Sequence, residues 1–312
     1  MNCLISTVKH LADKCSLVAL LCDAGQRLQR CAEETRGEMA DKVEGGTGKG
    51  AEKEKSRDSD FVEAVARGLS ILECYHDPLS VRQRGRLTLT DAANLTGLSR
   101  GTARRLLLTL KALHYVDSDG KNFWLTPKVL GLSSAFMIPL GLGEASARIL
   151  EELTKELDES ASVGILDQDS IVYIERVEVR RIYSSRIVNG TRLPAAYSSL
   201  GRVLLAGLSD EALARWIETH GLRAMTDKAI TDPGRFVREI DKVRNQGYAI
   251  IDEELEIGIR SIAVPIMNDK GRVFAALNSS TSTARHEVDE LTSDFLPRLK
   301  LASEKLSSTM NW

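Results

Sequence analysis

Residues 87–116 carry apolar positions at three- and four-residue spacing, which predicts two short helices joined by a tight turn. The first helix starts at Thr90 and Asp91, and Gly97 ends it where the chain must turn sharply. Ser99 is a suitable N-cap for the second helix. The expected buried stripe of that helix is Ala103, Leu106, Leu107, Leu110 and Leu113. The pattern therefore predicts a helix-turn-helix.

Two short apolar runs follow at residues 115–116 and 123–125, separated by a turn at 117–120 that contains Asp and Gly. Such runs predict a β-hairpin, and a hairpin at this place makes the unit a winged helix. A preceding helix is expected at residues 61–75, packed beneath the helical pair. The segment 77–86 reads as a loop, and its Arg82, Arg84 and Arg86 either contact phosphates or are simply solvated.

The rest of the chain alternates between helical and strand patterns. Pro127 is expected at the first position of a connector helix, which Pro139, Gly141 and Gly143 interrupt before a further helix at 144–157. The expected strands are 161–166, 171–177, 182–187, 248–252, 261–266 and 273–279. The expected helices are 197–206, 209–219, 233–246 and 287–307. This order predicts an α+β domain with helices on one face of a mainly antiparallel sheet.

Positive charge is concentrated at the start of the second helix of the pair. Residues 99–115 include four basic side chains and no acidic one, which is a local charge of +4 on a chain of net charge −2. A helix-turn-helix places this part of its second helix in the DNA major groove, where Arg binds guanine edges or phosphates. An ordinary amphipathic helix with a solvated basic face explains the turn and the cap less well. The predicted DNA-contacting residues are Thr90, Ser99, Arg100, Gly101, Thr102, Arg104, Arg105 and Lys121.

Length and composition exclude several classes of protein. A chain of 312 residues suggests about two domains, and 43% hydrophobic residues is ordinary for a globular protein. Its apolar runs fall well short of the ~20 residues that a membrane span needs. Five cysteines without a C-x-x-C pair argue against a zinc site or a disulfide framework, and favour a reducing, cytoplasmic compartment. We therefore expect neither a metal nor a cofactor.

Two blocks of sequence, in the same order, resemble the IclR family of bacterial transcriptional regulators. The first block is residues 90–116 with the preceding segment VARGLSILECY. The second consists of GTRLPAAYSSLGRVLLAGL at 190–208 and GYAIIDEELEIGIRSIAVPI at 247–266. The resemblance extends from about residue 61 to the C-terminus. One departure is His114, where the family usually has Gly, and the end of a helix tolerates this change.

The resemblance implies a domain organisation. Residues 61–126 would form a winged helix-turn-helix DNA-binding domain, 127–143 a connector helix, and 144–312 a GAF-like effector-binding domain with an antiparallel sheet. Residues 1–60 would be a disordered or mis-annotated extension and linker, because the polar segment 37–60 cannot bury enough apolar area to order itself. Since family members usually begin shortly before the first helix, Met39 is a candidate start of translation. The alternative is a poorly ordered helical tail.

A candidate anion site lies where residues 190–194 lead into the helix that opens at residue 197. Helix N-termini bind anions through free backbone amides, and the small residues Ser199 and Gly201 leave room for a ligand. A simple cap with close helix packing explains the same residues equally well. The resemblance implies a cleft for a small organic acid, formed by Ser199, Leu200, Ile251, Ile259, Ser261, Asn278 and Ser280. It also points to regulators of aromatic-acid breakdown, of the protocatechuate and 4-hydroxybenzoate type.

Catalysis is the less consistent interpretation. The five His residues lack metal-ligand spacing, there is no G-x-S-x-G nucleophile elbow, and the acidic cluster at residues 252–256 is typical of solvated charges. The expected partners are a double-stranded DNA operator, a small carboxylate effector and further copies of the chain, as a homodimer or tetramer. Two alternatives stay open. One is a sensor whose winged helix binds protein, and the other is a regulator of glyoxylate or sugar-acid metabolism.

Overall fold

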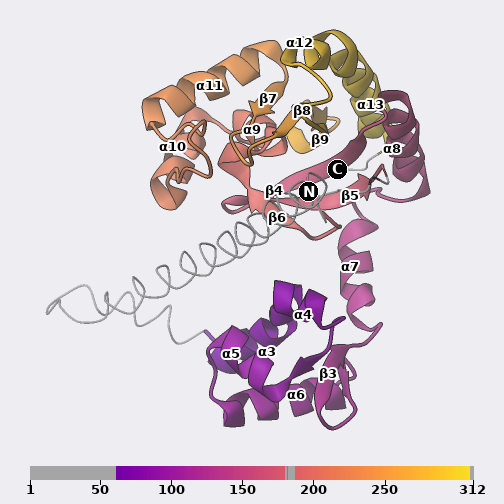
Figure 1. The fold of residues 1–312 in the computed structure, drawn as a ribbon, viewed down its shortest axis with the longest axis vertical. Coiled ribbons are helices and arrows are strands. Elements are labelled where there is room, and N and C mark those ends of the chain that lie inside the picture. The colour runs from indigo at the N-terminus through magenta and orange to yellow at the C-terminus, as the bar shows by residue number, and fades with distance from the viewer. Residues whose placement is uncertain (1–60, 180, 182–186, 310–312) are drawn as a thin grey trace, which may run out of the picture.

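The computed structural model describes residues 61–179, 181 and 187–309 (Figure 1). Our expectations for residues 1–60 lie outside these residues, as does most of the strand expected at 182–187. The described chain forms a smaller N-terminal domain and a larger C-terminal domain, connected through helix α7 (Val129–Met137). In this part of the chain no helix is both long and apolar enough to cross a membrane.

The N-terminal domain is the predicted winged helix. Its helices are α3 (Glu63–Glu73), η2 (Cys74–His76), α4 (Pro78–Arg82), α5 (Leu89–Thr96) and α6 (Arg100–Ala112). Its strands are β1 (Leu87–Thr88), β2 (Val116–Ser118) and β3 (Asn122–Leu125), which pair antiparallel in the order β1-β3-β2. The expected loop at 77–86 was partly wrong, because its first half continues from η2 into the short helix α4.

Local hydrogen bonds define the turn between α5 and α6. Thr88 caps α5, so the expected start at Thr90 was two residues late. The Thr88 hydroxyl accepts from the Asp91 backbone N–H at 3.2 Å, and the Asp91 carboxylate accepts from the Thr88 N–H at 2.9 Å. Gly97 ends α5 with φ +69°, a left-handed conformation that favours glycine. Ser99 caps α6, as predicted, by accepting from the Thr102 N–H.

The apolar stripe of α6 packs against α3 and α5. Ala103 and Leu107 are fully buried, and they share one core with Ile71 of α3 and Ala92 of α5. The expectation for Leu113 was wrong, because its side chain is 51% exposed. The helix ends at the preceding residue, and the chain then turns away from the core.

The C-terminal domain contains a six-stranded antiparallel sheet in the order β6-β5-β4-β9-β8-β7. The strands are β4 (Ser160–Asp167), β5 (Ser170–Val177), β6 (Arg192–Pro194), β7 (Ala249–Asp252), β8 (Ile259–Met267) and β9 (Val273–Ser282). The helices are α8 (Glu144–Leu157), η3 (Ala195–Tyr197), α9 (Ser199–Ala206), α10 (Asp210–His220), α11 (Pro233–Gln246), α12 (Val288–Glu290) and α13 (Leu296–Thr309). A π-helical turn, η4 (Leu291–Phe295), joins α12 to α13, so the closing helix is continuous but irregular.

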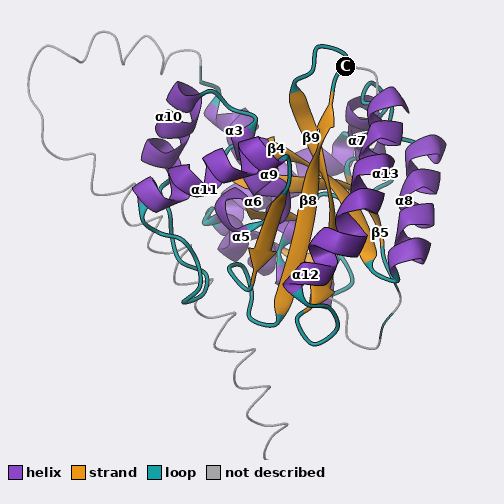
Figure 2. Cartoon of the chain, turned by 90° about the horizontal axis from the view of Figure 1, so that it is seen from above, coloured by secondary structure: helices purple, strands orange, loops and turns teal. Residues whose placement is uncertain are grey.

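Helices cover both faces of this sheet, which corrects the expectation of one covered face (Figure 2). One core lies between the sheet and α8 with α13, and includes Leu150, Leu277 and Leu299. The other lies between the sheet and α9, α10 and α11, and includes Ala276 and Phe236. Adjacent residues of β9 point to opposite faces and are apolar on both, so each face requires its own helical cover.

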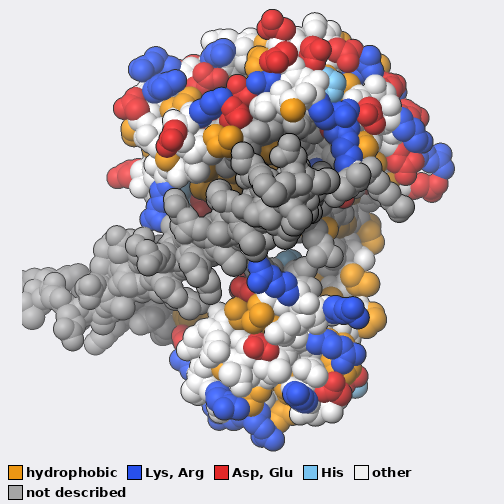
Figure 3. Space-filling model, viewed as in Figure 1, with side chains coloured by type: hydrophobic (Ala, Val, Ile, Leu, Met, Phe, Trp, Pro, Cys, Tyr) orange, Lys and Arg blue, Asp and Glu red, His pale blue; other side chains and the backbone are white. Residues whose placement is uncertain are grey.

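The connector α7 begins later than expected. Pro127 lies in a turn, and the helix starts at Val129 without a side-chain cap. None of its residues is buried, and Leu130, Leu132 and Phe136 are 63%, 59% and 48% exposed. Figure 3 shows hydrophobic side chains on the surface between the two domains. The apolar side chains of α7 are therefore exposed in the single chain.

Candidate DNA-binding surface and effector site

The basic side chains of α6 lie on the surface. Arg100, Arg104 and Arg105 are exposed, and within the described residues none of them forms an ion pair. Of the other predicted DNA-contacting residues, Thr90, Ser99, Gly101 and Lys121 are exposed and Thr102 is half-buried. Several Lys and Arg side chains lie on the visible face of this domain, some of them at its outer end (Figure 3). The unpaired positive charge is therefore available to a polyanion.

The wing is held against the body of the domain by Arg86. Its guanidinium lies 4.2 Å from the centre of the Trp124 ring and 3.2 Å from the Asp119 carboxylate. Backbone hydrogen bonding from Asn122 is the largest of the effects that lower the pKa of Asp119 to about 2. Asp119 therefore stays charged at physiological pH and organises the turn that presents Lys121. Because the Arg86 guanidinium already contacts Trp124 and Asp119, it is less suited to bind a DNA phosphate, which was one of the two alternatives that the sequence allowed.

The predicted effector residues do come together on one face of the sheet. Ile251, Ser261 and Ser280 lie opposite one another in a single row across β7, β8 and β9. Asn278 lies in the next row on the same face, opposite Ala263. Ile259 is two residues from Ser261 and so shares that face. Since Ala263 packs in the core beneath α9, this face is the one that α9 covers.

Helix α9 supplies the remaining two predicted residues, both fully buried. Ser199 lies 3.5 Å from Asn278, which donates to it through Nδ2, and a second donation from Nδ2 reaches Ser280 at 3.2 Å. Leu200 packs on Gly164, where an added Cβ would lie 2.9 Å from the leucine Cδ1. The helix itself is capped by Ser198, whose hydroxyl accepts from the Gly201 N–H at 3.0 Å.

Gly201 has a role different from the one expected. A Cβ at this position would lie 2.0 Å from the carbonyl oxygen of Ala195, so glycine is required for the close approach of two backbone segments. The expectation that it leaves room for a ligand was therefore wrong. The neighbouring Arg202 is 1% exposed and binds the same η3 turn, donating to the Ala196 carbonyl at 2.5 Å. Together these contacts fix where the first turn of α9 meets the sheet.

The acidic cluster that raised the possibility of catalysis consists mostly of paired charges. Glu254 binds Arg202 at 2.6 Å, Asp252 binds Arg260 at 2.7 Å, and Glu253 binds Lys228. The hydrogen bond from Lys228 is the main reason that the pKa of Glu253 is lowered. Among the described residues there is no group of His, Cys, Asp and Glu that would hold a metal ion.

Three further polar residues on this face were missed by the sequence analysis. Arg176 lies opposite Ser162, which in turn lies opposite Asn278, so the three residues form one row. Arg176 donates through Nη1 to the Ser162 hydroxyl at 2.8 Å. Burial raises the pKa of Tyr173, while the charge of Arg176 and a hydrogen bond with Asn278 act against that increase. The alternation of side chains along β5 could have placed Tyr173 on this face, but it does not predict that Arg176 also lies on it.

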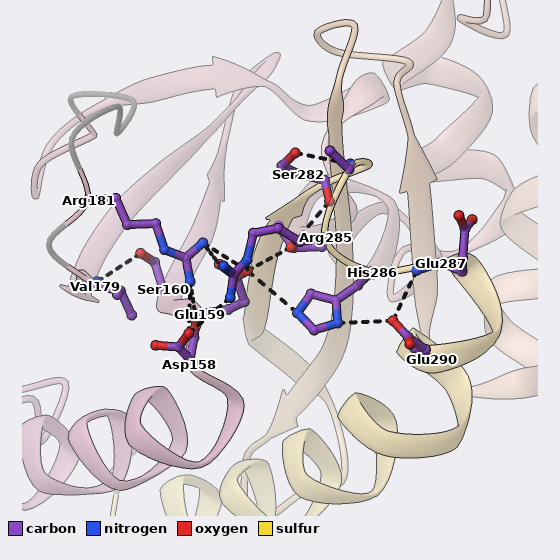
Figure 4. A network of polar contacts seen from close by, with 12 residues as sticks. Asp158, Glu159, Ser160, Val179, Arg181, Ser282, Arg285, His286, Glu287 and Glu290 are labelled. Atoms are coloured by element: carbon purple, nitrogen blue, oxygen red, sulfur yellow. Dashed lines mark hydrogen bonds and ion pairs between the residues drawn. The ribbon is translucent and has the colours of Figure 1, made fainter.

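A separate network ties the segment after β5 to the end of the sheet (Figure 4). Glu159, which is 4% exposed, accepts from Arg181 at 2.8 Å and from Arg285 at 2.7 Å. The Thr281 hydroxyl also donates to it at 2.8 Å, and His286 Nε2 lies 3.7 Å away. Glu159 precedes Ser160 on β4 and so points to the sheet face opposite the predicted effector residues. This network therefore anchors the chain next to the candidate site without entering it.

Two domains of one protein family match the chain over nearly all of its described length. The IclR helix-turn-helix domain matches residues 64–120, and the bacterial transcriptional regulator IclR C-terminal domain matches residues 137–308. The first range falls within the N-terminal domain, and the second extends from the last residue of α7 through the C-terminal domain.

Individual relatives agree with both matches. The p-hydroxybenzoate hydroxylase transcriptional activator of Acinetobacter baylyi is 36% identical over 81% of this chain and 93% of that protein. A putative transcriptional regulator from Rhodococcus is 42% identical and superposes with a TM-score of 0.70 over 80% of this chain and 98% of the other. The inducer-binding domain of a PobR double mutant from Acinetobacter, in complex with 3-hydroxybenzoic acid, is 33% identical with a TM-score of 0.51, over 53% of this chain and 97% of that domain.

Proposed function

Because the chain belongs to the IclR family of bacterial transcriptional regulators, which are not enzymes, we propose that it binds an operator through α6 and the wing under the control of a small aromatic carboxylic acid. The observation that carries the DNA-binding half is the group of exposed, unpaired arginines at the start of α6. They stand at the place where a helix-turn-helix meets base edges and phosphates. Its place of action is accordingly the cytoplasm.

The DNA-binding proposal is tested by fluorescence anisotropy with a promoter fragment from beside the coding region. Replacing Arg104 and Arg105 with Ala is expected to weaken binding, and to make the plot of log K against log salt shallower by about 0.9 for each phosphate that the protein no longer neutralises. The matched control replaces Arg238 and Lys242 with Ala, since both are exposed basic residues on α11 of the other domain. Unchanged retention of DNA by the α6 variant would instead favour a module that binds protein.

The effector proposal assigns the seven residues on the α9 face as the ligand site. Its support is the mixture of donors and apolar surface there, with Ser261, Asn278 and Ser280 beside Ile251. The aromatic class is supported by relatives whose names concern p-hydroxybenzoate and 3-hydroxybenzoic acid. A thermal-shift screen of hydroxybenzoates against glyoxylate and sugar acids tests it. A ligand at a hundred times its Kd stabilises the protein by about 2.7 kcal/mol, and a response to sugar acids alone would refute the aromatic assignment.

We further infer that the protein acts as a homo-oligomer. Exposed apolar side chains lie on α3 and α7, among them Leu69 at 52% and Leu130 at 63% exposure. Contiguous exposed apolar surface marks interaction sites, and two recognition helices are needed to read two half-sites. A second copy is therefore the proposed occupant. Replacing Leu69 and Leu130 with Glu is expected to lower the mass measured by light scattering, which also separates dimer from tetramer, and an unchanged mass would refute this interface.

A further inference from the structure

Arg176 is a buried cation on the same sheet face as the proposed effector residues. Its side chain is 7% exposed. It stands at the β5 end of the row that continues through Ser162 to Asn278. Tyr173 lies on the same face in the next row of the sheet, opposite Gly164. Arg176 therefore borders the proposed site directly.

The guanidinium of Arg176 has one edge that the described residues leave largely unused. Nη1 donates to Ser162, whereas Nε is buried and has no hydrogen-bond partner in the described part of the chain. The nearest carboxylate to Nη2 is that of Glu178, at 3.7 Å, which exceeds hydrogen-bonding distance. Nε and Nη2 form one edge of the planar guanidinium, and this edge can bind a carboxylate through two parallel hydrogen bonds.

Leaving this edge unpaired is costly, because a guanidinium stays protonated and a buried donor without a partner loses its hydration. Asn278 adds a second such group, as its Oδ1 is buried and no described residue donates to it. Other buried polar atoms of the described residues also lack a partner, among them Ser279 Oγ on the opposite face of the sheet. Arg176 and Asn278 differ from these because they lie in one row of the sheet and one of them is a cation, whose unpaired donors are the more costly. This pairing indicates a site whose hydrogen bonds are completed by a ligand.

We propose that Arg176 is the residue that binds the carboxylate of the effector, side-on through Nε and Nη2. This inference rests on the proposed function. Asn278 Oδ1 accepts a hydrogen bond from a donor elsewhere on the same ligand. Specificity for acids over neutral analogues of the same shape then resides mainly in one arginine on β5. The amides at the N-terminus of α9 have a smaller part in it, since one of them is already used by the Ser198 cap.

The test compares charged and neutral ligands on the full-length protein by isothermal titration calorimetry. The probes are 3- and 4-hydroxybenzoate, each paired with its primary amide. For the acid that binds more tightly, Arg176→Gln is expected to reduce affinity by about 30-fold or more. The affinity of the corresponding amide should change less than about threefold. Arg176→Lys restores part of the preference, because a lysine supplies the charge but not the paired donors.

Two control variants separate this role from a structural one. Arg192→Gln removes an arginine of the adjacent strand that pairs with Asp167 at the surface, and it should leave both affinities unchanged. Glu178→Gln removes the other neighbour of Arg176 and should leave the preference for acids intact. If the unmodified protein binds the acid and Arg176→Gln keeps the acid-over-amide preference, this inference is refuted and the proposed function stands. If the unmodified protein binds neither acid, this inference and the assignment of an aromatic effector are both refuted, whereas the proposed binding of DNA stands on its own test.

Discussion

Replacing Glu254 with Gln is expected to destabilise the C-terminal domain by about 3 kcal/mol, because it leaves a buried arginine without its counter-ion. The side chain of Arg202 is 1% exposed and that of Glu254 is 12% exposed, with 2.6 Å between Nη2 and Oε2. Arg202 also stacks at 4.8 Å on the ring of Phe236, so it has no route to water. Glu254 further accepts from the Ile230 N–H at 3.2 Å, a bond that the Gln carbonyl can keep.

The magnitude follows from the burial of the pair. Breaking a buried pair by removing one partner costs roughly 3–5 kcal/mol, and the partial exposure of Glu254 places this case near the lower limit. Removing both charges is expected to cost less than the sum of the single changes. Arg202→Met, Glu254→Gln and the double variant therefore form a cycle, with an expected coupling energy of about 2 kcal/mol.

The measurement is urea denaturation of the full-length protein followed by circular dichroism. The control is Arg192→Gln, which breaks an ion pair whose two side chains are about half exposed, and for which little change is expected. A cost of Glu254→Gln within the error of the control, or additive single changes, would refute the argument that this pair fixes the start of α9.

Three further outcomes are expected. Gly201→Ala should destabilise the domain by about 3 kcal/mol, since the new Cβ overlaps the Ala195 carbonyl, and unchanged urea unfolding would contradict the close approach. His114→Gly should raise the melting temperature of the N-terminal domain by relieving a φ of +63°, by about 1 kcal/mol in stability, and a lower melting temperature would oppose this reasoning. Burial raises the pKa of the Cys74 thiol from 9.0 to about 11, so the folded state holds its proton more tightly than the unfolded state. The contribution of this thiol to the free energy of unfolding is therefore fully present below about pH 9 and is lost as the pH rises to about 11. Alkaline unfolding of Cys74→Ala should accordingly depend less on pH, and an identical pH dependence would count against burial of the thiol.

The sequence predicted the winged helix well because its signals are local. The caps, the glycine at the turn and the three- to four-residue spacing each act within one or two helical turns. Gly97 and Ser99 accordingly have the roles expected of them. The burial of Leu113, in contrast, depends on the direction in which the chain leaves the helix. The chain leaves the helix through His114, whose backbone is left-handed. A residue other than glycine adopts this conformation at a cost in free energy, and the spacing of apolar residues along the sequence gives no sign of it.

The sequence also identified residues that meet on the α9 face, mainly through resemblance to a family. Periodicity alone assigns strand residues to a face, but it cannot say which strands are neighbours. The pairing of β4 with β9 is such a case, because it joins segments more than a hundred residues apart in the chain. The role of Gly201 is similar, since only the folded chain brings the Ala195 carbonyl against it.

Most of the helices and strands and the basic start of α6 follow from the amino-acid sequence, and the resemblance to a family supplied the seven candidate effector residues. Which charged side chain of β5 lies on the face of the candidate site is decided only by the tertiary structure. Strict alternation from Tyr173 would place Glu175 on the α9 face, but the pairing of β4 with β5 shifts at Val163 and Gly164. Beyond the shift, Glu175 points toward α8, and Arg176 lies opposite Ser162 on the α9 face. A bulge of one residue thus replaces an acid by a base, because side chains on a strand alternate with a period of two.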